Sequence, residues 1–326
     1  MGHVFLTRPL GDVVEQFRPQ LAEELNIPLR IHPDPGSPPT REEMLEAVRG
    51  AEAIISLVTD RIDAELLDAA GEQLKVVANV AVGYDNIDLD AAAQRNVTVT
   101  NTPGVLDEAV ADLTLALILA TTRRVVEGDR FIRTGEPWIW GPKDWVGLDV
   151  SAGATLGIIG LGRIGMAVAK RAHAFGMRII ATGRRAHDDD ARALGVVPAA
   201  SVDELLPAAD IVSLHCPLTP ETTHLIDAGA LGSMKPGSYL INTGRGPLVD
   251  EEALADALDS GHLAGAGLDV HEFEPEINPR LRAMESAVLL PHIGSAGDAT
   301  RNAMASLALR NAVAVLSGDE PLTPVS

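Results

Sequence analysis

Three ionisable side chains, Arg245, Glu274 and His292, each follow an apolar run with the composition of a buried β-strand. A histidine paired with a carboxylate is a general acid whose pKa the carboxylate raises, and an arginine offers a bidentate clamp for an organic acid. Together they suit hydride chemistry on an anionic carbonyl compound. Each also has a simpler interpretation: a loop histidine, a solvated acid before a proline, and a surface charge.

The strands that would position these residues are Ser238–Asn242, Ala264–Val270 and Ala287–Leu290. Carboxyl ends of parallel strands share one edge of a sheet, where ligands of open α/β proteins bind. Other elements of the same alternation are a helix capped by Ser201 and Glu204, a strand at Ile211–His215 and a helix at Glu251–Ser260. The pattern predicts a parallel, doubly wound sheet.

A glycine fingerprint, Gly160-x-Gly162-x-x-Gly165, follows the predicted strand Thr155–Ile159. A helical pattern then runs to Phe175, and Met177 to Ala181 forms a second apolar strand. In such a unit the first glycine permits a tight turn, the second lets the backbone approach a pyrophosphate, and the third lets helix pack on strand. The helix N-terminus then faces the phosphates. The context favours a dinucleotide site over an ordinary glycine-rich turn.

The end of that second strand reads Thr182-Gly183-Arg184-Arg185. An NAD-selective fold normally has an acid here, which accepts a hydrogen bond from the ribose 2′-hydroxyl. With no carboxylate and two guanidinium groups, the segment favours a 2′-phosphate. We therefore predict NADPH as the preferred cofactor and NADH as the less favoured one; the alternative is two arginines merely exposed in a loop.

The first hundred residues show a separate α/β pattern, with strands at His3–Leu6, Leu29–His32, Ile54–Val58, Leu74–Val80 and Val97–Thr100. Predicted helices end near Leu25 and Ala70, and Thr40 with Glu43 makes a capping box for a third that runs to Arg49. A long helix from about Leu106 to Val126 leads into the next domain. The last helix, roughly Asp298–Leu316, has no sheet partner left beside it, so we expect it to pack on the N-terminal layer.

The bulk properties exclude several classes of partner. The chain has 326 residues, 46% of them hydrophobic, and a net charge of −20. Such a charge argues against nucleic acid or an anionic membrane as a partner. A single cysteine, Cys216, rules out an internal disulfide and fits a reducing compartment. With no signal-peptide pattern at the N-terminus, we expect a cytoplasmic protein that binds a small molecule and no metal.

The chain's three tryptophans, Trp138, Trp140 and Trp145, lie in one loop that also contains proline and glycine. A chain with so few aromatic residues that gathers its tryptophans in one loop is typical of an interface or a pocket wall, although simple packing is the alternative.

Several ordered motifs give the sequence a specific resemblance to the D-2-hydroxyacid dehydrogenase family over nearly the whole chain. They are Gly157 to Gly165, His215-Cys216-Pro217-Leu218-Thr219, Asn242-Thr243-Gly244-Arg245-Gly246, Gly267-Leu268-Asp269-Val270, Glu274-Pro275 and Pro291-His292-Ile293-Gly294. The resemblance implies that Arg245, Glu274 and His292 form a catalytic triad. It also implies a substrate domain of residues 1–100 plus 294–326, into which a dinucleotide-binding domain of residues 101–293 is inserted, with the active site between them. Both domains would be Rossmann- or flavodoxin-like.

The resemblance extends to binding residues. Amides near Val82 and Gly83 would hold the substrate carboxylate, Leu57 would line the pocket, and Asp269 would hold the nicotinamide carboxamide. Further cofactor contacts implied in this way are Arg163 and Ile164 at the pyrophosphate, together with Cys216, Pro217, Thr222, Thr243 and Gly294.

Within the family, the segments around Thr182-Gly183-Arg184 and Arg123-Arg124 and the tryptophan loop are most similar to glyoxylate/hydroxypyruvate reductases. That similarity implies a homodimer in which Trp138 or Trp140 closes the neighbouring substrate pocket. It predicts NADPH-preferring reduction of glyoxylate or hydroxypyruvate, with His292 as the general acid. The alternatives are a bulkier 2-keto acid as substrate or, in a different class, a dinucleotide-sensing corepressor.

Overall fold

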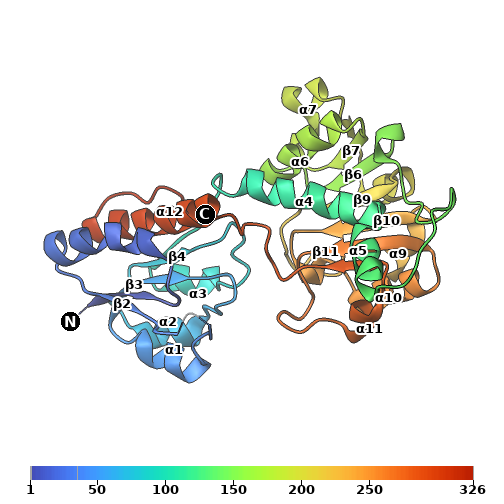
Figure 1. The fold of residues 1–326 in the computed structure, drawn as a ribbon. Helices are drawn as coiled ribbons and strands as arrows, with labels where there is room; N and C mark the ends of the chain where they lie inside the picture. Colours follow the sequence, from blue (N-terminus) through green and yellow to red (C-terminus); the bar gives the residue numbers. More distant parts are fainter. Residues whose placement is uncertain (1, 35, 326) are drawn as a thin grey trace. The chain divides into compact units, whose positions relative to one another are not determined.

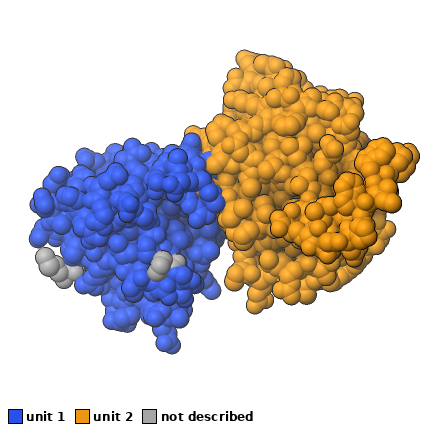
Figure 2. Space-filling model, in the orientation of Figure 1, with its two compact units in different colours: residues 1–106, 296–326 blue, residues 107–295 orange. Residues whose placement is uncertain are grey.

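The computed structural model describes residues 2–34 and 36–325. Its chain divides into two compact units, Met1–Leu106 with Ala296–Ser326 (unit 1) and Asp107–Ser295 (unit 2), which Figure 2 colours separately. Unit 1 takes both ends of the chain, and unit 2 is formed by the segment between them. The predicted boundaries were at residues 100 and 293, whereas the compact units divide at 106 and 295.

Unit 1 is built on a five-stranded parallel sheet in the order β2-β1-β3-β4-β5. This order is the flavodoxin-like one. The strands are β1 (His3–Leu6), β2 (Leu29–Ile31), β3 (Ala51–Ser56), β4 (Val76–Asn79) and β5 (Thr98–Thr100). The helices are the 3-10 helix η1 (Asp12–Gln16), the π-helical turn η2 (Gln20–Glu24), α1 (Arg41–Ala47), α2 (Ala64–Ala70), α3 (Leu89–Gln94) and α12 (Asp298–Ser317).

The last helix packs on this sheet, as the sequence predicted (Figure 1). Leu309 and Ala312 of α12 lie in one buried cluster with Leu6 of β1 and Ala78 of β4. Full burial of a leucine side chain stabilises the folded state by about 1.5–3 kcal/mol. Because it buries Leu309 against the sheet, α12 completes the core of unit 1. Beyond it, the amide of Val325 donates to the carbonyl of Val99, which covers the open edge of β5.

The prediction of one continuous helix ending near Leu25 is wrong. The chain forms η1 and then η2, with Pro19 between them. Proline has no amide hydrogen and its ring clashes with the preceding turn, so a continuous α-helix is interrupted there. The capping box at Thr40 is confirmed, since its side chain accepts from the amide of Glu43 while the Glu43 carboxylate accepts from the amide of Thr40.

Unit 2 is built on a seven-stranded parallel sheet in the order β12-β11-β10-β9-β6-β7-β8. The strands are β6 (Thr155–Ile159), β7 (Arg178–Thr182), β8 (Val197–Pro198), β9 (Ile211–Leu214), β10 (Ser238–Asn242), β11 (Leu263–Leu268) and β12 (Ala287–Leu289). Strand order reverses between β6 and β9, which is the ligand-binding switch point of a doubly wound fold. The predicted Rossmann-like class is therefore confirmed.

Helices cover both faces of this sheet (Figure 1). They are α4 (Asp107–Thr122), α5 (Val125–Thr134), α6 (Arg163–Ala174), α7 (Asp189–Ala193), α8 (Val202–Leu205), α9 (Ala228–Ser233), α10 (Glu251–Asp259) and α11 (Pro279–Ala283). The 3-10 turns are η3 (Val150–Ala152), η4 (Arg184–His187), η5 (Leu206–Ala208) and η6 (Gly246–Leu248). No helix within residues 2–34 and 36–325 is long and apolar enough to span a membrane.

The single helix predicted from Leu106 to Val126 is two helices. Arg124 adopts a left-handed conformation with φ of 53°, which ends α4 and starts α5. The carbonyl of Thr122 accepts from the amide of Leu148 in place of the next helical turn, and the Arg124 guanidinium pairs with Glu127 of α5. Tertiary contacts thus override the helical pattern at this point.

The capping box predicted at Ser201 forms only in part. Ser201 accepts from the amide of Glu204, but the Glu204 carboxylate turns to the amide of Ala200.

Candidate active site

The three fingerprint glycines meet three different surroundings, as the three roles of such a motif require. Gly160 has φ of 96°, and a Cβ there would lie 2.5 Å from the amide nitrogen of Cys216, on the neighbouring strand end. A Cβ at Gly165 would lie 2.6 Å from the carbonyl oxygen of Gly160, so α6 packs directly on β6. A Cβ at Gly162 would meet nothing within 4 Å. Backbone at Gly162 is therefore open to a phosphate group.

The N-terminus of α6 lies beside this opening, because Gly162 is its N-cap and has no side chain to satisfy the first amides. Arg163 is exposed in the first turn, and Ile164 packs partly on the core. Unpaired amides at a helix start form an anion site, so the geometry fits a dinucleotide pyrophosphate.

The end of β7 carries no carboxylate. The amide of Gly160 donates to the Thr182 hydroxyl (3.4 Å), so the residue at the expected acid position faces the glycine turn. Arg184 is exposed and makes no hydrogen bond or ion pair within the described part of the chain. Arg185 differs, because its Nε donates to Asp188 (3.1 Å). The two arginines therefore differ, because Arg185 already has a carboxylate partner and Arg184 has none among the described residues.

The loop after β9 is closed by Thr222. Its hydroxyl donates to the carbonyl of Pro217 (2.8 Å) and accepts from the amide of Thr219 (2.7 Å). Burial raises the pKa of the Cys216 thiol to about 11, so this cysteine is a neutral wall residue.

Asn242, the last residue of β10, shapes the turn that carries Arg245. Its Nδ2 donates to the carbonyl of Arg245 (2.8 Å), and its Oδ1 accepts from the amide of Gly244 (3.0 Å). The Thr243 hydroxyl lies 2.9 Å from that of Thr114 on α4. Arg245 is half-buried, with Nη1 donating to the carbonyl of Gly244 (2.9 Å). The arginine is therefore held by its own turn.

Asp269 fixes the turn that carries His292. Its buried carboxylate accepts the amides of Ile293 and Gly294, each at 2.7 Å, and its carbonyl accepts the amide of His292 (2.8 Å). Burial raises the pKa of Asp269 and the two amides oppose that effect only in part. The bonds hold His292 at φ of 55°, a conformation uncommon for a residue with a side chain.

Glu274 and His292 form a direct pair. His292 Nδ1 lies 2.9 Å from Glu274 Oε2, and Oε1 of the same carboxylate accepts from the amide of His271 (3.0 Å). Burial raises the pKa of Glu274, but the hydrogen bond and charge of His292 and the His271 amide outweigh it, so the pKa is lowered. An ionised carboxylate only accepts, so Nδ1 carries the proton and Nε2 is directed to other partners.

In unit 1, the turn after β4 has its carbonyls bound and its amides available. Asn79 Nδ2 donates to the carbonyl of Gly83 (2.9 Å), and Asn101 Nδ2 donates to that of Val82 (2.8 Å). The amides of Val82 and Gly83 make no hydrogen bond within the described residues. Leu57 is partly exposed just beyond β3, with its amide bound to Asp60. Such a turn is suited to an anion.

The tryptophan loop splits in two. Trp145 packs in its own chain, 5.0 Å from the Phe131 ring and 5.1 Å from the Arg124 guanidinium carbon. Trp138 and Trp140 are 60% and 75% exposed, so neither side chain is buried in its own chain.

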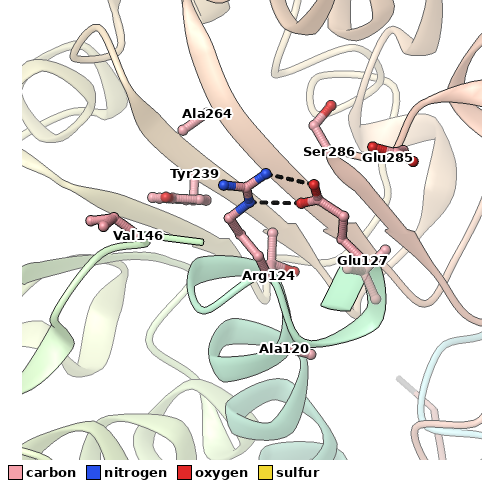
Figure 3. A pocket seen from close by; sticks show the side chains of 10 residues that line it. Ala120, Arg124, Glu127, Val146, Tyr239, Ala264, Glu285 and Ser286 are labelled. Carbon is pink, nitrogen blue, oxygen red and sulfur yellow. Dashed lines mark hydrogen bonds and ion pairs between the residues drawn. The ribbon is translucent and has the colours of Figure 1, made fainter. Parts of the chain in front are cut away.

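A pocket of about 390 Å³ lies elsewhere in unit 2 (Figure 3). It is lined by Tyr239, Ala264 and Val288, near the starts of β10 to β12, and by the Arg124 and Glu127 pair. Arg245, Glu274 and His292 follow the other ends of the same strands. The pocket is therefore separate from the candidate active site.

Sequence patterns missed three residues that organise the site, Asn79, Asn242 and His271. Asn79 and Asn242 each end a central strand and bind the following turn, and their repeated position was the available signal. His271 donates to Glu274 through its main chain, a role that no spacing reveals.

Comparison with known proteins identifies the family of this chain. Residues 115–294 match the family model described as D-isomer specific 2-hydroxyacid dehydrogenase, NAD binding domain. The glyoxylate reductase of Thermococcus litoralis is 45% identical over 98% of this chain and 95% of its own length.

Solved structures are similar to this chain over its whole length. A protein from Thermus thermophilus is 49% identical, with a TM-score of 0.90 over 100% of both chains. An NADPH-dependent glyoxylate/hydroxypyruvate reductase from Sinorhizobium meliloti, solved with NADP and malonate, is 34% identical with a TM-score of 0.84, over 100% of this chain and 97% of its own. The chain belongs to the D-isomer specific 2-hydroxyacid dehydrogenase family and is a nicotinamide-dinucleotide-dependent oxidoreductase.

Proposed function

We propose that the protein reduces a small 2-keto acid, glyoxylate or hydroxypyruvate, to the 2-hydroxy acid and prefers NADPH. The observation that carries this proposal is the His292 and Glu274 pair at the sheet edge where Arg245 also emerges. Relatives named glyoxylate reductase support the substrate class.

The proposed mechanism assigns one task to each of the three side chains. A reduced nicotinamide, when bound, would be the source of the hydride that the keto carbon accepts. His292 donates the Nε2 proton to the carbonyl oxygen, while Glu274 holds Nδ1–H and balances the imidazolium charge. Arg245 binds the substrate carboxylate and polarises the carbonyl group. The same groups, running in reverse, oxidise the hydroxy acid.

The cofactor is proposed to lie along the glycine turn and the strand ends of unit 2. Open backbone at Gly162 and the α6 N-terminus support a pyrophosphate there, with Gly160, Gly165, Arg163 and Ile164 around it. Further proposed contacts are Cys216, Pro217, Thr222, Thr243, Asp269 and Gly294. Because Asp269 already accepts two amides, a bound carboxamide must use its remaining lone pairs.

NADPH preference is proposed from Arg184. Its guanidinium is exposed at the end of β7 and has no partner among the described residues, in a position without a competing carboxylate. Arg185 already pairs with Asp188 (3.1 Å) and lies 3.8 Å from Asp190, so it contributes only by giving up these carboxylate contacts. The NADP complex of the Sinorhizobium reductase is consistent with this choice.

For the substrate, we propose that the available amides of Val82 and Gly83 bind a carboxylate oxygen and that Leu57 lines the pocket. Successive backbone amides in a turn form a concavity that binds an anion.

We also propose a homodimer. Helix α5 has no buried residue, and Ile132, Trp138, Ile139 and Trp140 are 56%, 60%, 90% and 75% exposed. Large apolar side chains gathered on one segment mark an interface. A tryptophan of this loop, Trp138 or Trp140, would close the pocket of the neighbouring subunit. Light scattering on the parent and on Trp140→Ala tests this, with a monomeric parent contradicting it.

A direct assay tests the proposed reaction. NADPH and NADH oxidation should be followed with glyoxylate, hydroxypyruvate, pyruvate and bulkier 2-keto acids. We expect turnover of the two small acids, faster with NADPH. Activity only with bulky acids would contradict the substrate, and no activity at all would favour a dinucleotide sensor. His292→Ala should lower kcat by about 10²- to 10⁴-fold and leave cofactor affinity unchanged. Cytoplasmic location is a further proposal that cell fractionation checks.

A further inference from the structure

His271 stands just beyond β11, and its ring is buried, with 4% of the residue exposed. Ring atom Nε2 lies 3.0 Å from the carbonyl oxygen of Leu290. A carbonyl only accepts, so Nε2 carries a proton. The ring thereby ties the segment after β11 to the segment that leads into His292.

The other ring nitrogen, Nδ1, lies 3.7 Å from Oε1 of Glu251. Glu251 is itself buried, at 2% exposed, and is held by Glu272, whose amide donates to Oε1 and whose carboxylate accepts from the Glu251 amide. Without a proton, Nδ1 would present its lone pair to a carboxylate; with one, the two groups attract. Burial lowers the pKa of His271, but Glu251, the Leu290 carbonyl and Glu274 outweigh it, so the pKa is raised.

The main chain of His271 contacts the other two catalytic segments. Its amide donates to Oε1 of Glu274 (3.0 Å). Gly246, directly after Arg245, packs so closely that a Cβ there would lie 1.9 Å from the His271 carbonyl carbon and oxygen. One buried residue therefore touches the segments that carry Arg245, Glu274 and His292.

We propose that His271, as an imidazolium paired with Glu251, is a positioning residue that holds these three segments together for the proposed reaction. It acts in two separable ways. First, the hydrogen bond from the ring to the Leu290 carbonyl fixes the strand end before His292. Second, the positive charge of the ring favours the ionised form of Glu274, as His292 does, whereas the Asp269 carboxylate repels it. The effect of His271 on catalysis rests on the proposed function, whereas its effect on the pKa of Glu274 does not.

Two substitutions separate these effects. His271→Gln keeps a donor for Leu290 but has no charge, and His271→Phe removes both. For His271→Gln, we expect kcat within about threefold of the parent and an acid limb of kcat/KM about 0.5–1 pH unit higher, because an ionised Glu274 loses a nearby cation. For His271→Phe, we expect the same shift and about a tenfold lower kcat, since the Leu290 bond is also lost. Cofactor Kd should stay within about twofold in both.

The control is His262→Gln, which alters a similar ring bond, Nε2 to the Leu231 carbonyl (3.1 Å), just before β11 begins. It should leave the pH profile unchanged. An unshifted acid limb in His271→Gln together with parental kcat in His271→Phe overturns the proposal. If His271→Phe does not fold, the shift in His271→Gln decides alone.

A second readout does not depend on turnover. A ¹³C NMR titration of the Glu274 carboxyl should show a higher pKa in His271→Gln than in the parent, and an equal pKa overturns the proposal. If the parent reduces no 2-keto acid, the proposed function fails, and the titration still decides whether His271 acts on Glu274.

Discussion

The bond between Glu274 and His292 gives the most direct test of the proposed chemistry. Glu274→Gln keeps the shape of the side chain and removes its charge. A glutamine has one accepting oxygen, whereas Glu274 accepts both His292 Nδ1–H and the His271 amide. In the variant the imidazolium loses its counter-charge, and one of the two donors, His292 Nδ1–H or the His271 amide, meets an NH₂ group and loses its acceptor.

The size of the effect follows from that single bond. A hydrogen bond to a charged group contributes about 1.5–3 kcal/mol, and each 1.4 kcal/mol is tenfold in rate, which gives about 10- to 100-fold. The two side chains are 32% and 29% exposed, and solvent weakens such a pair. We therefore expect kcat/KM for the keto acid to fall about tenfold to thirtyfold, with cofactor Kd unchanged.

The pH dependence has a fixed sign. The pKa of Glu274 is lowered from its ordinary value of 4.5, so activity that needs its carboxylate is present above the lowered value and is lost as the pH falls through it. That acid limb should be absent from the variant. Glu276→Gln, the same change at an exposed position of the same loop, is the matched control. Parental kcat/KM in Glu274→Gln, measured by steady-state kinetics from about pH 3 to 9, would refute the reasoning.

Three further predictions concern the cofactor domain. Gly165→Ala places a Cβ 2.6 Å from a backbone carbonyl oxygen, and it should lower the free energy of unfolding, measured by urea titration, by about 1–3 kcal/mol. Gly162→Ala has open space around it, so it should leave the free energy of unfolding unchanged and weaken cofactor binding. Equal losses of stability in the two variants would contradict the assigned roles. Arg184→Ala should weaken NADPH binding about tenfold and leave NADH binding unchanged in fluorescence titrations, and an equal loss for both cofactors would disprove the 2′-phosphate contact. Burial disfavours the ionised form of Asp210, but Lys235 and the Thr155 amide outweigh it, so the pKa of Asp210 is lowered. Asp210→Asn should therefore lower the free energy of unfolding by about 1–2 kcal/mol at pH 7, and by progressively less as the pH falls below the ordinary pKa of 3.8. A loss of stability that does not depend on pH would contradict the pairing.

Local patterns determined much of the fold. All the parallel strands except β8 (Val197–Pro198), together with the glycine turn, followed from apolar runs and glycine spacing, because these signals span only a few neighbouring positions. The last helix was placed on unit 1 because no sheet partner was left for it in its own domain. The same signals placed Arg245, Glu274 and His292 at strand ends. They failed at Pro19 and at Arg124, where a missing amide and a tertiary bond to Thr122 broke the predicted helices.

Only the tertiary structure decided how the site is held. Glu274 and His292 are 18 positions apart, and Asp269 reaches amides 24 and 25 positions away. The open space at Gly162 and the buried ring of His271 are likewise consequences of packing. Residue type states what a side chain is able to donate or accept, but distances and burial arise only when distant segments fold together, and they determine which partner it has.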